Sequence, residues 1–115
     1  MAEQQPQQAR LTLDIGFDES KIPASISLSG TDLPSPIAAK AVLLSVFDEQ
    51  QRDTLRIDLW TKNFQVAEMD RLVYNTLRGL SETYRKATKN EQLADQFGQF
   101  VRHFGEVTEI LPPRK

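Results

Sequence analysis

The stretch from Thr54 to Lys62 reads as a β-strand with alternating side chains, and the rest of the chain is organised around it. The alternate positions form two sets: Leu55, Ile57 and Leu59, against Arg56, Asp58 and Trp60. A period of two residues places successive side chains on opposite faces of a β-strand. The stretch is therefore predicted to be a central strand with one aliphatic face. Strand-like patterns precede it, and helix-like patterns follow it.

The chain before this strand carries further strand and loop patterns. Residues 10–18 alternate between apolar and polar residues, and a second alternating segment begins with Ile22-Pro23 and runs to Ser29. Residues 30–36 contain Gly and Pro residues that favour a loop, and residues 48–53 are a polar hairpin loop before the central strand. Two hairpins are therefore predicted.

The segment Ala38–Phe47 is open to two interpretations. Its first residues, Ala38 to Ala41, favour a helix, whereas the run from Val42 to Phe47 favours a mostly buried strand. We prefer the strand, since the polar loop that follows would then connect it to the central strand as a hairpin.

Beyond the central strand, the apolar spacing changes to the three and four residues of a helix face. Asn63 is a candidate N-cap for a first helix that runs to about Tyr84, and Thr88-Lys89-Asn90-Glu91 matches a capping box that opens a second. The apolar face of the second helix is expected to comprise Leu93, Phe97, Phe100, Val101, Phe104 and Val107.

The sequence thus predicts an α+β fold: a four-stranded antiparallel sheet of two hairpins, covered on one face by a C-terminal two-helix hairpin. A length of 115 residues with 39% hydrophobic and 26% charged residues is typical of one globular domain. We assign this domain to residues 10–111, between a disordered tail at 1–9 and a basic tail at 112–115.

Composition excludes several classes of function. The chain has no cysteine, and a net charge of −2 gives no general attraction to nucleic acid. His103 is the only histidine, so we expect no metal site. The sequence has no Gly-rich phosphate loop, no GxSxG and no HExxH motif, so we also expect no cofactor and no catalytic residues. The sequence shows neither a signal peptide nor a stretch long enough to span a membrane, which favours the cytoplasm. Two acidic groups are interpreted as solvated turns: Asp14, Asp18 and Glu19, then Asp48, Glu49 and Asp53.

The polar face of the central strand is the candidate binding site. The period of two places Arg56, Asp58, Trp60 and Lys62 together. Tryptophan and arginine dominate the energetics of protein interfaces, so this set could anchor a partner or a second copy. The alternative is a structural salt-bridge lattice, with Trp60 packed on a neighbouring strand or loop. The residues alone leave both interpretations open.

The chain resembles a known family at several of these places. Leu55-Arg56-Ile57-Asp58-Leu59-Trp60-Thr61-Lys62 is similar to a strand motif of the gliding motility-associated protein C (GldC) family of Bacteroidetes. The likeness continues through five further segments: Glu68-Met69, the helix with Tyr74, Thr76, Leu77 and Thr83, Arg85-Lys86-Ala87-Thr88, Ala39-Lys40-Ala41 and Leu44-Ser45-Val46-Phe47-Asp48. The resemblance implies a cytoplasmic, non-enzymatic accessory protein whose protein partners belong to the motility or linked secretion apparatus.

Two other functions stay open at this point. The order of strands and helices resembles that of the export chaperone SecB, which implies client binding through apolar grooves near the loop at 30–37 and possible dimerisation through the sheet. A small-ligand binder or an unrecognised enzyme, with a pocket between sheet and helices lined by Tyr74, Tyr84 or His103, is the second alternative.

Overall fold

The computed structural model describes residues 7–112. They divide into two compact units, which meet in sequence at Phe64 and Gln65: a β unit first and a helical unit after it. Each unit is described by itself. Residues 1–6 and 113–115 of the two predicted tails lie outside the described residues. The assignment of residues 10–111 to one domain stays a prediction.

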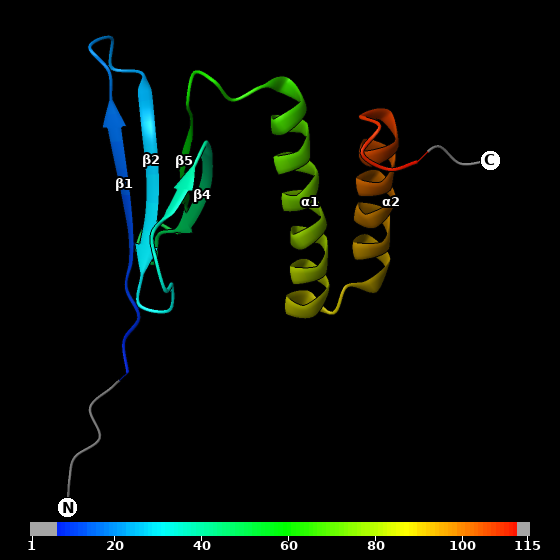
Figure 1. The fold of residues 1–115 in the computed structure, drawn as a ribbon. Coiled ribbons are helices and arrows are strands. Elements are labelled where there is room, and N and C mark those ends of the chain that lie inside the picture. Colours follow the sequence, from blue (N-terminus) through cyan, green and yellow to red (C-terminus); the bar gives the residue numbers. More distant parts are fainter. Residues whose placement is uncertain (1–6, 113–115) are drawn as a thin grey trace, which may run out of the picture. The chain divides into compact units, whose positions relative to one another are not determined.

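The β unit begins with a three-stranded antiparallel sheet (Figure 1). Strand β1 (Leu11–Phe17) pairs with β2 (Pro23–Gly30), and β2 pairs with the short β3 (Ile37–Ala39). The register places apolar residues opposite each other, as in Leu13 with Leu28 and Ile15 with Ile26. This matching of the alternating patterns forms the first predicted hairpin, and Ile26 at its centre is 3% exposed.

A second, two-stranded antiparallel sheet completes the unit. Strand β4 (Ala41–Phe47) pairs with β5 (Thr54–Trp60) along the full length of both strands. The preference for strand over helix in the segment from residue 38 to residue 47 is confirmed, as is the hairpin loop at residues 48–53.

The prediction of one four-stranded sheet is wrong in the number of strands and of sheets, since residues 7–112 form five strands in two sheets. The predicted strand Ala38–Phe47 is interrupted at Lys40, where the chain changes its pairing partner from β2 to β5. The backbone N–H of Thr61 donates to the Lys40 carbonyl at 2.8 Å and extends the β4–β5 ladder to the break. The Thr61 side chain is buried, and its hydroxyl lies 3.3 Å from the same carbonyl oxygen.

The two hairpin turns use aspartate in the same way. One carboxylate oxygen of Asp18 accepts the N–H groups of Ser20 and Ile22, and one of Asp48 accepts those of Gln50 and Gln51. Such local bonds replace the ladder bonds that a reversing chain gives up. The acidic residues that open these loops therefore shape turns, in agreement with their predicted role.

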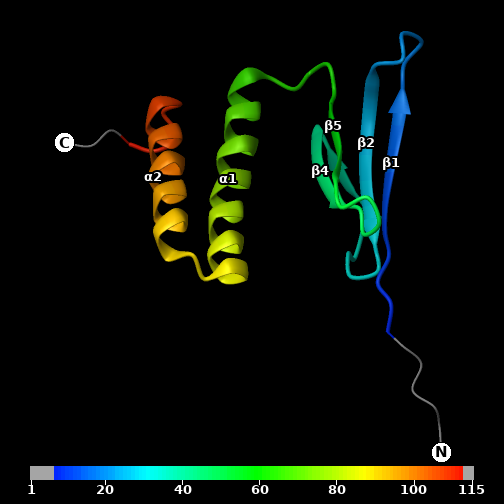
Figure 2. The same cartoon turned by 180° about the vertical axis from the view of Figure 1, so that it is seen from behind.

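The helical unit contains α1 (Val66–Thr88) and α2 (Glu91–Val107), which run antiparallel (Figures 1 and 2). Both predicted caps are shifted. Helix α1 is capped by Gln65, whose N–H donates to Glu68 at 3.1 Å, instead of by Asn63. Helix α2 is capped by Asn90, whose side chain accepts the Leu93 N–H, instead of by Thr88.

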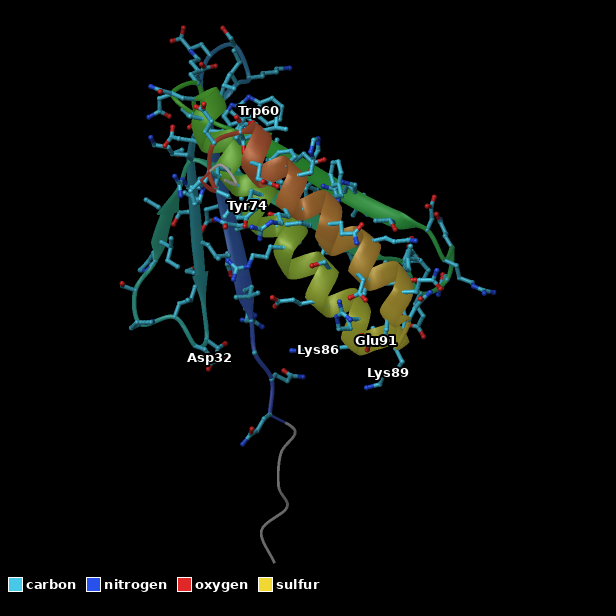
Figure 3. The ribbon with its side chains drawn as sticks, turned by 90° about the vertical axis from the view of Figure 1, so that its right-hand side faces the viewer. Asp32, Trp60, Tyr74, Lys86, Lys89 and Glu91 are labelled. Carbon is cyan, nitrogen blue, oxygen red and sulfur yellow. The ribbon has the colours of Figure 1, made fainter. Side chains whose placement is uncertain are left out.

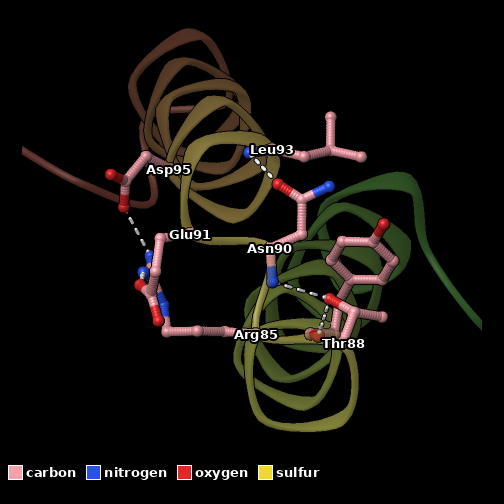
Figure 4. A network of polar contacts seen from close by, with 7 residues as sticks. Arg85, Thr88, Asn90, Glu91, Leu93 and Asp95 are labelled. Carbon is pink, nitrogen blue, oxygen red and sulfur yellow. Dashed lines mark hydrogen bonds and ion pairs between the residues drawn. The ribbon is translucent and has the colours of Figure 1, made fainter.

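The turn between the helices is held by charge. Arg85 in the last turn of α1 forms ion pairs with Glu91 and Asp95 of α2, the second at 2.6 Å (Figure 4). Asp95 first and then Glu91 raise the pKa of Arg85, because both carboxylates stabilise its charged form. Lys86, Lys89 and Glu91 lie at this same end of the hairpin (Figure 3).

Helix α2 contacts α1 through its small residues. Ala94, Val101 and Gly105 are buried, and Gly105 lies against the buried Tyr74 of α1. The larger apolar residues of α2 follow a neighbouring stripe of the helix, and Phe100 in that stripe is 53% exposed. The absence of a side chain at Gly105 lets α2 approach Tyr74 of α1 closely at this point. The predicted cover of the sheet by the helices stays a prediction.

No helix within residues 7–112 combines the length and the apolar character needed to cross a membrane.

Candidate functional site: the outer face of the β4–β5 hairpin

The register of the second sheet sorts its side chains into two faces. Residues directly opposite each other in an antiparallel pair project to the same face. One face is aliphatic and comprises Val42, Leu44, Val46, Leu55, Ile57 and Leu59. The other, here called the outer face, consists of four cross-strand pairs: Ala41 with Trp60, Leu43 with Asp58, Ser45 with Arg56, and Phe47 with Thr54.

An ion pair occupies the middle of the outer face. The Arg56 guanidinium donates to both carboxylate oxygens of Asp58, from Nη2 to Oδ1 at 2.6 Å and from Nε to Oδ2 at 3.2 Å. Its Nη1 group donates across the hairpin to the Ser45 hydroxyl. The Arg56 and Asp58 side chains are 50% and 40% exposed. The two charges compensate each other, which leaves a hydrogen-bonded and neutral centre that is open to solvent.

Aromatic residues flank this centre at opposite ends of the hairpin. Trp60 at the end of β5 is 50% exposed, and Phe47 at the end of β4 is 67% exposed. Each has a small cross-strand neighbour, Ala41 beside Trp60 and Thr54 beside Phe47. Aromatic rings that protrude beside small residues, around a polar centre, have the chemistry of interface anchors.

Three of the four predicted site residues are thus on one face, and the fourth is elsewhere. Lys62 lies beyond the end of β5, and its ammonium group pairs with Asp18 of the β1–β2 turn at 2.5 Å. The period of two fails at this position because the strand has already ended. The Lys62 ammonium, followed by the Ile22 N–H, lowers the pKa of Asp18, since both stabilise the carboxylate.

Both interpretations of the polar face have a counterpart in the structure. The structural lattice is present, because Arg56 contacts both Asp58 and Ser45. Trp60 is nevertheless half exposed, as the binding interpretation requires. Sequence reasoning missed Phe47 and Leu43 as members of this face. The signal that would have found them is the register of the β4–β5 hairpin, which pairs Phe47 with Thr54.

The remaining candidate residues form no comparable arrangement. His103 lies beside Phe100 with 6.3 Å between ring centroids. Within residues 7–112, no three acidic or histidine side chains cluster as metal ligands would. Beside the loop at 30–37, a cavity is lined by Gln8, Ala9, Arg10, Leu11 and Thr31, which is a mainly polar surface.

The helical unit carries a shallow groove of about 340 Å³ between its two helices. Its lining consists of Tyr74, Arg78, Ser81, Gly98, Val101, Arg102 and Leu111. Of the three residues predicted to line a ligand pocket, the groove includes Tyr74 but neither Tyr84 nor His103.

A comparison with protein families finds one match over most of the chain. The family model described as "Gliding motility-associated protein GldC-like" matches residues 23–110. This range includes β2 to β5 and both helices. No curated protein and no solved structure matches the chain at a significant level.

Proposed function

Because the chain belongs to the GldC-like family of gliding motility-associated proteins, we propose that it is a non-enzymatic accessory protein of gliding motility. It acts in the cytoplasm through protein–protein contacts, and its contact surface is the outer face of the β4–β5 hairpin. The partners are components of the motility apparatus or of the secretion apparatus linked to it.

The observation that carries this proposal is the composition of the outer face. Trp60 and Phe47 expose half or more of their surface although both belong to regular strands. Exposed aromatic residues beside a hydrogen-bonded arginine are typical of interface hot spots. The Arg56–Asp58 pair is already satisfied in an open setting, which suits recognition better than proton transfer.

Paired alanine substitutions on the two faces of the hairpin test the proposal. We expect Trp60→Ala and Phe47→Ala to abolish colony spreading of the native host and the capture of motility components from its lysate. Leu55→Ala is the matched control, since Leu55 is 61% exposed on the opposite face of the same hairpin.

The control should behave as wild type, and thermal unfolding should show that all three variants fold. If the outer-face variants spread and capture partners as well as Leu55→Ala does, the outer face is not the contact surface.

A chaperone-like client binder is the second candidate function. The number of large apolar residues with exposed surface supports it, among them Leu11 at 73% and Ile37 at 47%, which lie on one face of the first sheet. Extended apolar surface is what a binder of unfolded clients needs. The test is suppression of aggregation of a reduced, unfolded client. Suppression that Leu11→Ser and Ile37→Ser weaken, while Trp60→Ala does not, would favour this function.

A further inference from the structure

The outer face of the β4–β5 hairpin has an internal order that goes beyond a general binding surface. Along the hairpin, its cross-strand pairs follow one another in four rows: Ala41/Trp60, Leu43/Asp58, Ser45/Arg56 and Phe47/Thr54. Each of the two end rows combines one large aromatic and one small residue. The large residue belongs to β5 in the first row and to β4 in the last. The two central rows carry one charge each, and these charges are opposite.

This order is self-complementary under two-fold rotation. Two copies can be stacked with their outer faces together and related by a two-fold axis. This axis lies in the interface, runs across the strands and passes between the two central rows. The rotation reverses the strand direction and exchanges the first row with the fourth and the second with the third. Isologous interfaces of this kind are the commonest in homo-oligomers.

The rotation brings unlike residues together in every row. Trp60 then faces Thr54 of the second copy, and Phe47 faces Ala41 of the second copy, so that each large residue meets a small one. Asp58 faces Arg56 of the second copy, and Arg56 faces Asp58 of the second copy. The intrachain pair becomes a four-charge network, for which a guanidinium with five donors and a carboxylate with four acceptor sites have the capacity.

Sheet geometry is compatible with such stacking. Sheets packed face to face keep their strands within about 30° of each other. Strands β4 and β5 have seven residues each, so this angle leaves the central rows in contact. A hairpin of two strands is also marginally stable alone, and a second layer on its outer face would stabilise it.

We propose that the outer face is the contact between two copies of this chain, which form a face-to-face dimer with two-fold symmetry. The proposal rests on the proposed function, because it adds a second copy of the chain as a partner of the same contact surface, for which that copy and the motility components compete. The face is narrow, and its buried area falls below the roughly 1,600 Å² of a standard interface. The dimer is therefore expected to be reversible and dependent on concentration.

Charge variants of the full chain test the proposal by sedimentation velocity over a range of concentrations. Asp58→Arg presents two positive side chains on the face, and Arg56→Asp presents two negative ones. Each variant alone should sediment as a monomer at concentrations where wild type is mainly dimer. An equimolar mixture of the two should restore the dimer, because opposite charges then face each other in both central rows. The double variant with both substitutions should dimerise by itself.

Glu82→Arg on α1 is the matched control, since it makes the same charge change at an exposed position of the helical unit and should leave the dimer intact. Restored association in the mixture also shows that both single variants are folded. A wild type that stays monomeric at its highest soluble concentration would overturn the proposal. So would single variants that dimerise like wild type, or a mixture that stays monomeric.

These outcomes are distinguishable from failure of the proposed function. If wild type is monomeric but Trp60→Ala still loses spreading and capture of motility components, the outer face binds a different protein and only the dimer is refuted. If the charge variants follow the dimer pattern but Trp60→Ala spreads and captures normally, the dimer stands and the role of this face in motility is refuted.

Discussion

The ring of Tyr74 in α1 lies against the backbone of Gly105 in α2 so closely that no side chain fits between them. A β-carbon at Gly105 would stand 2.7 Å from Cε1 of Tyr74 and 2.8 Å from Cδ1 of Leu111. The N–H of Leu111 donates to the Gly105 carbonyl at 3.0 Å, which holds the chain after α2 over the same point. Tyr74 is 8% exposed. At the other two helix glycines, Gly79 and Gly98, no atom lies within 4 Å of the position that a β-carbon would take.

Gly105→Ala is therefore expected to destabilise the helical unit. The added methyl group would displace a buried ring, and overpacking of this kind costs about 1–3 kcal/mol, which outweighs the gain in helix propensity. Gly79→Ala is the matched control, because no atom lies within 4 Å of the position that its β-carbon would take. The control should gain up to about 1 kcal/mol from propensity alone. Urea denaturation followed by circular dichroism measures both, and equal effects would contradict the close contact.

Asn90 is expected to carry the stability of the start of α2. Its Oδ1 accepts the Leu93 N–H at 3.1 Å, which satisfies a donor that the first turn of the helix otherwise leaves unpaired. Asn90→Ala should lower the free energy of unfolding by about 1 kcal/mol. Asn90→Ser keeps an acceptor at the same place and should stay close to wild type. The same denaturation measurement would reject Asn90 as the cap if serine and alanine destabilise equally.

The ion pair between Asp18 and Lys62 should make the β unit sensitive to acid. Lys62 holds the pKa of Asp18 in the folded state below its usual value. In the unfolded chain the pKa of an aspartate is about 3.9. The pair therefore stabilises the fold fully above about pH 5, and this contribution is lost as pH falls through the folded-state pKa.

Asp18→Asn keeps the oxygen that accepts the Ser20 and Ile22 N–H groups but removes the charge. Denaturation between neutral pH and about pH 2 should show a shallower loss of stability for this variant than for wild type. Lys62→Met should flatten the profile in the same way, because it removes the partner. Parallel profiles for wild type and both variants would show that the pair contributes nothing to acid sensitivity.

The kinds of element could be predicted from the sequence because each follows from local periodicity. The alternation of residues 10–18 became β1, the hairpin into β5 formed at the polar loop, and both helices lie near their predicted positions. Their caps were misplaced by two residues each, since Asn63 and Thr88 are plausible caps whose side chains have other local partners: Asn63 accepts from Thr61, and Thr88 accepts the Asn90 N–H.

The candidate site divides in the same way. That Arg56, Asp58 and Trp60 share a face follows from the period of two, and it holds within the strand. Lys62 was included by extending that period past Trp60, where β5 ends. Phe47 was missed because its place beside Thr54 depends on cross-strand register, which belongs to two segments at once.

Strands in the first half of the chain, helices in the second and a family motif in β5 all follow from the alternation and spacing of residues. The change of β-pairing partner at Lys40 and the stripe of α2 that meets α1 became known with the fold. A hydrophobic period indicates which face of an element can be buried, whereas strand pairing and close approach depend on the shape of the opposing element. At Gly105 the Tyr74 ring leaves no room for a side chain, and a hydropathy pattern does not show where close packing requires a glycine.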